Sequence, residues 1–208
     1  MKGAEAVLSK VSILGIPCVE KFRLKKKYRQ PGLDGKIRGE RTKREARLLN
    51  RAKEAGVPCP VVFQVGDFFI RMKFIEGKML HTEMGKRGIK QKEISDAARI
   101  LVRLHSQHII HGDFTPANLM LTKDGMAVID FGLGSISTDS EDKATDIVMM
   151  KKSLETFSEV GRSPTKTKKS LGKKGARFVL AYQKAGGHKS VVKLVSEIEK
   201  RARYMERS

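Results

Sequence analysis

The 208-residue chain has no tryptophan, only two cysteines and no uninterrupted apolar stretch of about eighteen residues. A helix needs roughly that many apolar residues to cross a bilayer, so we expect no membrane span. The N-terminal stretch MKGAEAVLSKVSILG is interrupted by Glu5 and Lys10, and no small-residue cleavage site follows, which argues against a signal peptide. Cys18 and Cys59 each lie among apolar residues. We expect both to be buried thiols in a reducing, cytoplasmic setting.

Acidic residues are scarce: 23 Asp and Glu stand against 43 Lys and Arg, giving a formal net charge of +20. Such an excess of one sign attracts polyanions and makes their binding sensitive to salt. A basic surface that serves stability alone is less favoured, because ion-pair networks need both signs. The composition therefore indicates binding of a nucleic acid, tRNA included, or of another acidic partner.

The hydrophobic patterning predicts a mixed fold. Apolar and polar residues alternate through the first thirty positions, and VVFQVG and FFIRMKFIEG predict two further strands joined at Gly66–Asp67. RQPGLDGKIRGE is rich in turn-forming residues and is expected to be a loop, followed by a helix from about Thr42 to Ala55. Helical spacing dominates from ISDAARILVRLHSQ onward, apart from NLMLT and MAVID, two short strands. We expect an α+β, two-lobed protein, with a β-rich lobe carrying one main helix over 1–75 and a mostly helical lobe over 76–208.

Three histidines, His105, His108 and His111, are spaced by three, which raises the possibility of a metal site on a helix. However, His111 directly precedes Gly112, where a helix would end, and no cysteine or carboxylate stands at ligand spacing. We therefore interpret His105 and His108 as helix-end residues, one or both of them exposed. We expect His111 to brace the loop that follows it.

That loop opens an ordered set of residues typical of kinases: HGD at 111–113, Asn118 five residues after the aspartate, and DFG at 130–132. Phosphoryl transfer requires positioned groups and counter-charge more than covalent chemistry. Asp113 is the candidate catalytic base that orients an acceptor hydroxyl and takes its proton. The oxygens of Asn118 and Asp130 are the candidate ligands for Mg²⁺, which prefers hard oxygen donors.

A kinase-type site also needs a lysine for the ATP phosphates and a helix glutamate that holds this lysine. Lys21 follows an apolar strand and is the favoured lysine, whereas residues 25–27 enter a loop. Glu45 lies inside the expected helix, whereas the rival Glu40 precedes it. We therefore predict that Lys21 and Glu45 form the ATP-binding pair.

Adenine is expected at the junction between the lobes, in an apolar cleft with backbone donors and acceptors. FFIRMKFIEG is the segment at this junction. Met72 would stand at the back of the pocket, and the backbone of Lys73 and Ile75 would face the base. Met72 could equally serve as core packing.

The set of Lys21, Glu45, Asp113, Asn118 and Asp130 resembles the protein-kinase superfamily, here as a minimal two-lobed form. The finer pattern is similar to the Bud-type, PRPK-like kinases, the small atypical kinase subunit of the KEOPS complex. The matching stretches are GAEAVL, EKFRLKKKYRQPGLDGKIRGERTKREARLL, MKFIEG, HGDFTPANLM, VIDFGLGS and EDKATDI.

This resemblance implies an ATP- and Mg²⁺-dependent serine/threonine protein kinase, autophosphorylating, or an ATPase. It also implies a role in threonylcarbamoyl-adenosine modification of tRNA beside KEOPS partners, chiefly the metal-dependent threonylcarbamoyl-transferase subunit. Asp146 resembles the buried aspartate that anchors the catalytic loop in the superfamily.

The chain departs from ordinary protein kinases in three places. The phosphate loop is reduced to GAEA at 3–6, Gly112 stands in place of the usual arginine, and Asp146 follows Gly132 by only fourteen positions. The resemblance also implies a basic C-terminal tail, and the chain from Lys200 keeps the basic residues of that tail but not its glycine. The short segment after DFG makes phosphorylation of free protein substrates doubtful. A small-molecule phosphotransferase of the aminoglycoside or choline kinase type is the alternative, disfavoured by the short basic second lobe. A RIO-like kinase is a close cousin, disfavoured by the reduced phosphate loop.

Overall fold

The computed structural model describes residues 6–156 and 172–205. Two sequence features therefore lie mainly or partly outside the described residues: the reduced phosphate loop at 3–6 and the basic tail, whose end is at 206–208. Within the described ranges, no helix has both the length and the apolar character needed to cross a bilayer.

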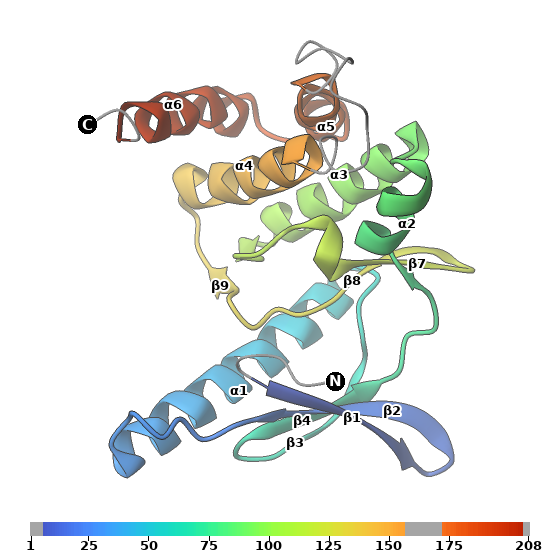
Figure 1. Cartoon of the computed structure of the whole chain (residues 1–208), viewed down its shortest axis with the longest axis vertical. Helices are drawn as coiled ribbons and strands as arrows, with labels where there is room; N and C mark the ends of the chain where they lie inside the picture. The colour runs from blue at the N-terminus through green and yellow to red at the C-terminus, as the bar shows by residue number, and fades with distance from the viewer. Residues whose placement is uncertain (1–5, 157–171, 206–208) are drawn as a thin grey trace.

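A four-stranded antiparallel sheet forms the first part of the molecule, in the order β1-β2-β4-β3 (Figure 1). Its strands are Ala6–Ile13 (β1), Ile16–Arg23 (β2), Val62–Val65 (β3) and Phe69–Lys73 (β4). The β1–β2 hairpin turns at Leu14 and Gly15, and both have positive φ, as a two-residue turn that matches the strand twist requires. The strands and the β3–β4 hairpin confirm the sequence prediction.

Helix α1 spans Pro31–Glu54 and is much longer than expected, because the segment predicted as a basic loop forms its first turns. Pro31 is suited to a helix start, where its missing N–H costs nothing. Asp34, fully buried, accepts hydrogen bonds from the Lys26 N–H at 3.1 Å and from Arg38 Nε at 2.7 Å. These contacts stabilise a glycine-rich turn sequence as helix, so the loop prediction was wrong.

The chain then forms a small sheet and two helices. The sheet has the order β5-β7-β8, with Lys78–Met79 (β5), Leu119–Thr122 (β7) and Gly125–Val128 (β8). The helices are Leu80–Arg87 (α2) and Gln91–Ser106 (α3). The predicted apolar stripe of α3 is buried: Ile94, Ala97, Ala98, Leu101 and Leu104. A two-stranded ladder joins Ile109–Ile110 (β6) to Ser135–Ile136 (β9).

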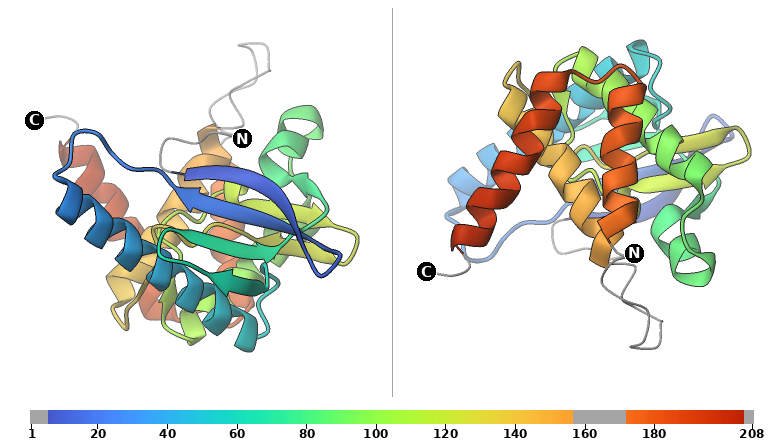
Figure 2. Two further views of the ribbon diagram at one scale, coloured as in Figure 1. Left: turned by 90° about the horizontal axis from the view of Figure 1, so that it is seen from below. Right: turned by 90° about the horizontal axis from the view of Figure 1, so that it is seen from above.

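Three helices complete the described chain: Ser140–Thr156 (α4), Gly172–Lys184 (α5) and Lys189–Met205 (α6). α6 packs on α4, and α5 packs on both α3 and α4. Figure 2 shows these helices together on the side of the molecule away from the four-stranded sheet. Phe178 and Tyr182 of α5 are buried in the core.

The arrangement is a β-rich part with one long helix beside a mostly helical part, as predicted (Figure 1). α1 lies between the four-stranded sheet and the remaining helices. The predicted boundary at residue 75 falls in the connection between β4 and β5 and stays a prediction. Cys18 and Cys59 are both buried free thiols, as expected.

Candidate active site

Lys21 of β2 and Glu45 of α1 form a buried ion pair. The Nζ of Lys21 lies 2.7 Å from Oε1 of Glu45, and Lys21 is only 8% exposed. β2 is paired on both sides, by β1 and β4, so the strand that carries Lys21 is fixed in the centre of the sheet. The rival Glu40 is an exposed residue of α1. The geometry therefore favours the Lys21–Glu45 pair named from the sequence.

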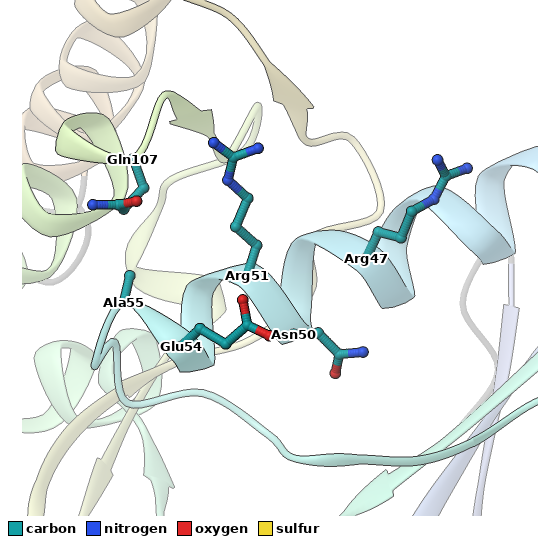
Figure 3. Close-up of a pocket in the computed structure, with 6 residues that line it drawn as sticks. All are labelled: Arg47, Asn50, Arg51, Glu54, Ala55 and Gln107. Atoms are coloured by element: carbon teal, nitrogen blue, oxygen red, sulfur yellow. The ribbon is translucent and has the colours of Figure 1, made fainter.

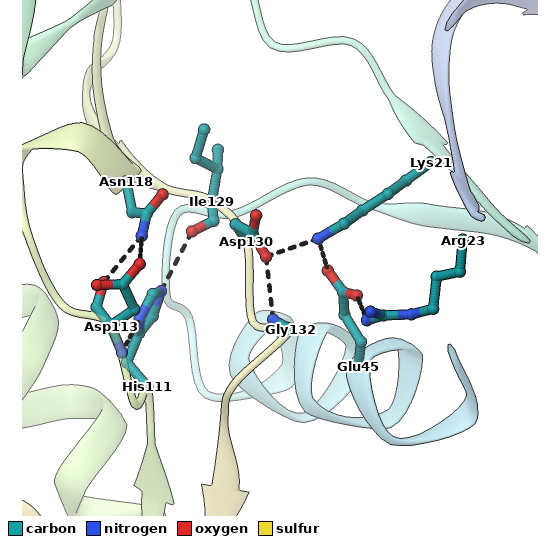
Figure 4. Close-up of polar contacts among 9 residues, drawn as sticks. All are labelled: Lys21, Arg23, Glu45, His111, Asp113, Asn118, Ile129, Asp130 and Gly132. Carbon is teal, nitrogen blue, oxygen red and sulfur yellow. Dashed lines mark hydrogen bonds and ion pairs between the residues drawn. The ribbon is translucent and has the colours of Figure 1, made fainter. Parts of the chain in front are cut away.

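Arg23 is a second cation on the same carboxylate, and the sequence reasoning missed it. Its Nη2 donates to Oε2 of Glu45, so each oxygen of Glu45 faces one positive charge (Figure 4). Both cations are almost fully buried. Residues two apart on a strand point to the same face, which is the signal that could have linked Arg23 to Lys21.

Asp130 reaches the same group from the segment after β8. Its Oδ1 lies 2.6 Å from the Nζ of Lys21 and accepts the Gly132 N–H at 3.0 Å. Burial opposes ionisation of Asp130, but Lys21 and the Gly132 N–H outweigh it and hold the pKa of the carboxyl below its usual value. A Cβ at position 132 would come within 2.9 Å of this same Oδ1, so the close contact requires glycine there.

Asp113 and Asn118 face each other within the loop that follows β6. The Nδ2 of Asn118 donates to Oδ2 of Asp113 at 2.8 Å and to the Asp113 carbonyl at 2.9 Å. Both donated bonds come from Nδ2, so the carbonyl oxygen of Asn118 points away from Asp113 (Figure 4). The Ile129 N–H donates to the Asn118 backbone carbonyl at 2.9 Å, which ties this loop to the segment that carries Asp130.

His111 braces the loop, as expected. The ring is fully buried. Its Nε2 lies 3.1 Å from the Ile129 carbonyl oxygen, and its Nδ1 accepts a hydrogen bond from the Asp113 N–H at 3.3 Å. Burial, which outweighs the nearby carboxylates, lowers the pKa of His111 and favours the neutral ring that these two bonds need. Its ring thus links the backbone of Asp113 to the residue just before Asp130.

Asp146 of α4 anchors the same loop through its backbone. It accepts the backbone N–H of His111 at 2.8 Å and of Gly112 at 2.9 Å. Gly112 has a positive φ of 76°, and a Cβ there would meet the Leu133 carbonyl oxygen at 2.3 Å. The anchoring contact expected for Asp146 is therefore present, and glycine at 112 has a steric reason.

His105 lies in the last turn of α3, as expected for a helix-end residue, and it is the buried one of the pair His105 and His108. It is only 4% exposed, and its Nδ1 lies 2.8 Å from the Tyr182 hydroxyl. Its Nε2 lies 3.2 Å from Oδ2 of Asp146. His108 is the exposed member of the pair. The partners of His105 come from α4 and α5, far along the chain, which is why local spacing did not reveal them.

The predicted adenine-binding residues lie at the end of β4 and just beyond it. Met72 is 9% exposed and pairs with Val19 of β2. The Lys73 N–H donates to the Val61 carbonyl at 2.8 Å and is engaged within the sheet, so of its backbone groups the carbonyl is the candidate for the base. The assignment of Met72, Lys73 and Ile75 to adenine stays a prediction.

A magnesium ion fits the donor set of this site. In the described part of the chain, no group of three or more His, Cys, Asp and Glu residues is placed to hold a metal by protein ligands alone. Mg²⁺ usually takes one or two protein oxygens and completes its shell with water and substrate phosphates. The Asn118 carbonyl oxygen and the second carboxylate oxygen of Asp130 are groups of that kind.

Comparisons with known proteins agree with this reading. The RIO domain model matches residues 18–159. In solved structures, the fold resembles the Rio2 kinase–ADP/Mg²⁺–phosphoaspartate complex from Chaetomium thermophilum, with a TM-score of 0.64 and 18% identity over 98% of this chain and 70% of that one. The likeness to Rio2 shows the protein-kinase-like fold alone.

Two curated relatives are closer in sequence. The KEOPS complex subunit Bud32 of Pyrococcus abyssi is 35% identical over 93% of this chain and 87% of that protein. A probable bifunctional tRNA threonylcarbamoyladenosine biosynthesis protein of Methanobrevibacter smithii is 38% identical over 98% of this chain but only 36% of that protein. The chain thus spans about a third of the length of the bifunctional relatives. It belongs to the RIO-domain family, as a kinase of the Bud32 type. From the sequence alone, the reduced phosphate loop disfavours a RIO-like kinase. The match to the RIO domain shows that this loop does not separate the chain from the RIO-domain family.

Proposed function

We propose that the chain is an ATP-dependent phosphotransferase that acts as a serine/threonine protein kinase, autophosphorylating, or as an ATPase. We further propose that it works as a KEOPS subunit required for threonylcarbamoyl-adenosine modification of tRNA. The observation that carries the first part is the arrangement of two bonded groups. Lys21 bonds both Glu45 and Asp130, and Asn118 bonds Asp113. The backbone of Ile129, next to Asp130, donates to the Asn118 carbonyl and links the two groups. The second part is supported by the near full-length similarity to the Bud32 subunit.

The residues of this chain have distinct roles in the proposed reaction. Lys21, held by Glu45, supplies positive charge to the nucleotide phosphates. The Asn118 and Asp130 oxygens would hold Mg²⁺, which when bound neutralises charge on the phosphates. Asp113 orients the hydroxyl of a serine, a threonine or water and accepts its proton. The acceptor oxygen bonds to the terminal phosphorus, the bond to the bridging oxygen breaks, and ADP leaves.

The partner and tRNA parts of the proposal follow from the Bud32 resemblance and from the net charge of +20. We propose the metal-dependent threonylcarbamoyl-transferase subunit as the chief partner. The long bifunctional relatives have room for a second unit of this kind beyond the part that matches this chain.

The test is γ-labelled ATP given to the purified chain alone, then with the partner subunit, then with tRNA added. Label on the chain supports the kinase, and free phosphate supports the ATPase. Label on a small molecule such as an aminoglycoside or choline would instead support the alternative reading. No release and no transfer under all three conditions would contradict the proposal.

A further inference from the structure

The outer face of α1 is lined by exposed basic side chains, away from the buried Glu45. A cavity of about 870 Å³ lies between this face and β9. The lining contains five basic residues, Arg41, Lys43, Arg44, Arg47 and Arg51, and one acidic residue, Glu40. The surface has a strong positive charge where α1 passes the segment after DFG.

A second cavity of about 490 Å³ continues this surface toward the end of α1 and shares Arg47 and Arg51 with the first. Figure 3 shows both arginines projecting to the same side of the helix, with Gln107 across from Arg51. None of the six residues that line this second cavity belongs to the catalytic set. The two cavities together form one elongated basic trough along α1.

Two carboxylates, Glu40 and Glu54, also line the trough, but three of its arginines are not paired with a carboxylate of the described residues. Arg44, Arg47 and Arg51 are all exposed, and none of them takes part in an ion pair among the described residues. Within the described part of the chain, the side chain of Arg47 donates one hydrogen bond, from Nε to the backbone carbonyl of Lys43 at 3.4 Å. A row of exposed guanidinium groups without carboxylate partners creates a local positive potential that attracts anions.

We propose that this arginine face (Lys43, Arg44, Arg47 and Arg51) binds the phosphate backbone of an RNA. Arg44 and Arg51 are seven residues apart, about 10 Å along the helix axis, which matches about three successive phosphates of a nucleic-acid strand. The planar guanidinium fork suits phosphate oxygens. The choice of RNA as the anionic ligand rests on the proposed function in tRNA modification. The location of the binding face rests on the structure.

An acidic protein segment is the competing occupant, and the lining of the trough disfavours it. Stable protein interfaces usually centre on buried apolar or aromatic anchors. Of the apolar residues that line the larger cavity, Leu48 is buried and Ile37 is partly covered, and only Ile136 is well exposed. A ligand in the trough would thus be bound mainly by charged groups, which is typical of protein contacts with a nucleic-acid backbone.

The test compares two triple variants of the full chain, each of which removes three positive charges. The first is Arg44→Gln, Arg47→Gln and Arg51→Gln. The matched control is Lys184→Gln, Lys189→Gln and Lys193→Gln, three exposed lysines of α5 and the region of α6. Binding of a fluorescein-labelled tRNA transcript is measured by anisotropy without ATP, at 50 to 200 mM salt. Thermal unfolding checks that both variants fold.

The arginine triple variant should bind the transcript on the order of tenfold to a hundredfold more weakly, and its salt slope should fall by about one per arginine. The control should change affinity much less. Equal weakening in both variants, or none in the first, would overturn the assignment. Tighter, arginine-dependent binding of a polyglutamate peptide than of tRNA would assign the face to an acidic protein instead. ATP turnover, assayed separately, tests the proposed function and does not depend on this outcome.

Discussion

Oδ1 of Asp130 lies 2.6 Å from the Nζ of Lys21, and the same ammonium lies 2.7 Å from Oε1 of Glu45. One cation thus joins β2, α1 and the segment after β8. Arg23 also pairs with Glu45, so this carboxylate balances the charge of two cations, Lys21 and Arg23.

Lys21→Ala should reduce ATP turnover by on the order of a hundredfold or more, because the site loses the cation positioned for the phosphates. The measurement is steady-state phosphate release at saturating ATP. Lys25→Ala, an exposed neighbour, is the control and should retain near wild-type turnover. Full turnover in Lys21→Ala would redirect the assignment to the lysines at 25–27.

Glu45→Ala should lower the free energy of unfolding by about 3–5 kcal/mol, because it removes the buried carboxylate that Lys21 and Arg23 share. Urea titration followed by circular dichroism measures the change. Glu54→Ala, an exposed glutamate on the same helix, is the control and should stay within about 0.5 kcal/mol of wild type. Similar values for the two variants would show that Glu45 is not the partner of Lys21 and Arg23.

Tyr182→Phe should lower kcat severalfold, with a smaller change in KM for ATP. The hydroxyl of Tyr182 bonds Nδ1 of His105, which in turn contacts the Asp146 carboxylate that anchors the catalytic loop. Loss of this bond should also cost about 1–3 kcal/mol of stability. Tyr28→Phe, at an exposed tyrosine, is the control. A loss of stability with unchanged kcat would show that Tyr182 serves packing alone.

The stability of the protein should fall as the pH drops below about 6.5, the ordinary pKa of histidine. Burial lowers the pKa of His105 and of His111, so the unfolded chain takes up these protons first and is favoured at lower pH. The stabilising contribution is complete above that pH and declines below it. Urea titrations at pH 7.5, 6.5 and 5.5 measure the trend.

His105→Gln should flatten this pH dependence, whereas His188→Gln, at an exposed histidine, should leave it in place. The range from pH 7.5 to 5.5 lies above the pH at which carboxylates usually take up protons. A change in stability within this range can therefore be assigned to histidines and not to carboxylates. An unfolding free energy that is constant from pH 7.5 to 5.5 would contradict the assignment of neutral, buried imidazoles.

The central set of the site could be predicted because its order and spacing along the chain reflect its chemistry. Asp113 and Asn118 are five residues apart and touch directly, and Asp130 follows one short hairpin later. Lys21 and Glu45 come from a strand and a helix whose patterns are strong. The binding of ATP and Mg²⁺ by these residues remains to be tested, but their proximity was predicted correctly.

The parts that could not be predicted depend on contacts distant in sequence. The start of α1 was missed because glycines at 32, 35 and 39 are typical of loops, whereas the buried Asp34 with Arg38 stabilises a helix there. The burial of His105 depends on Tyr182, which is 77 positions away. Helix propensity and local spacing do not contain that information.

The most direct test of the central claim is γ-labelled ATP turnover by Asp113→Asn beside wild type, with ADP binding followed by thermal shift. Asn keeps the shape of the side chain but cannot accept the proton of the acceptor hydroxyl, an effect worth about 10²–10⁴ in rate. We predict that Asp113→Asn loses turnover by such a factor, that Asp130→Ala loses it as well, and that Asp113→Asn still folds and binds ADP. Wild-type turnover in folded Asp113→Asn would contradict the assignment of this site.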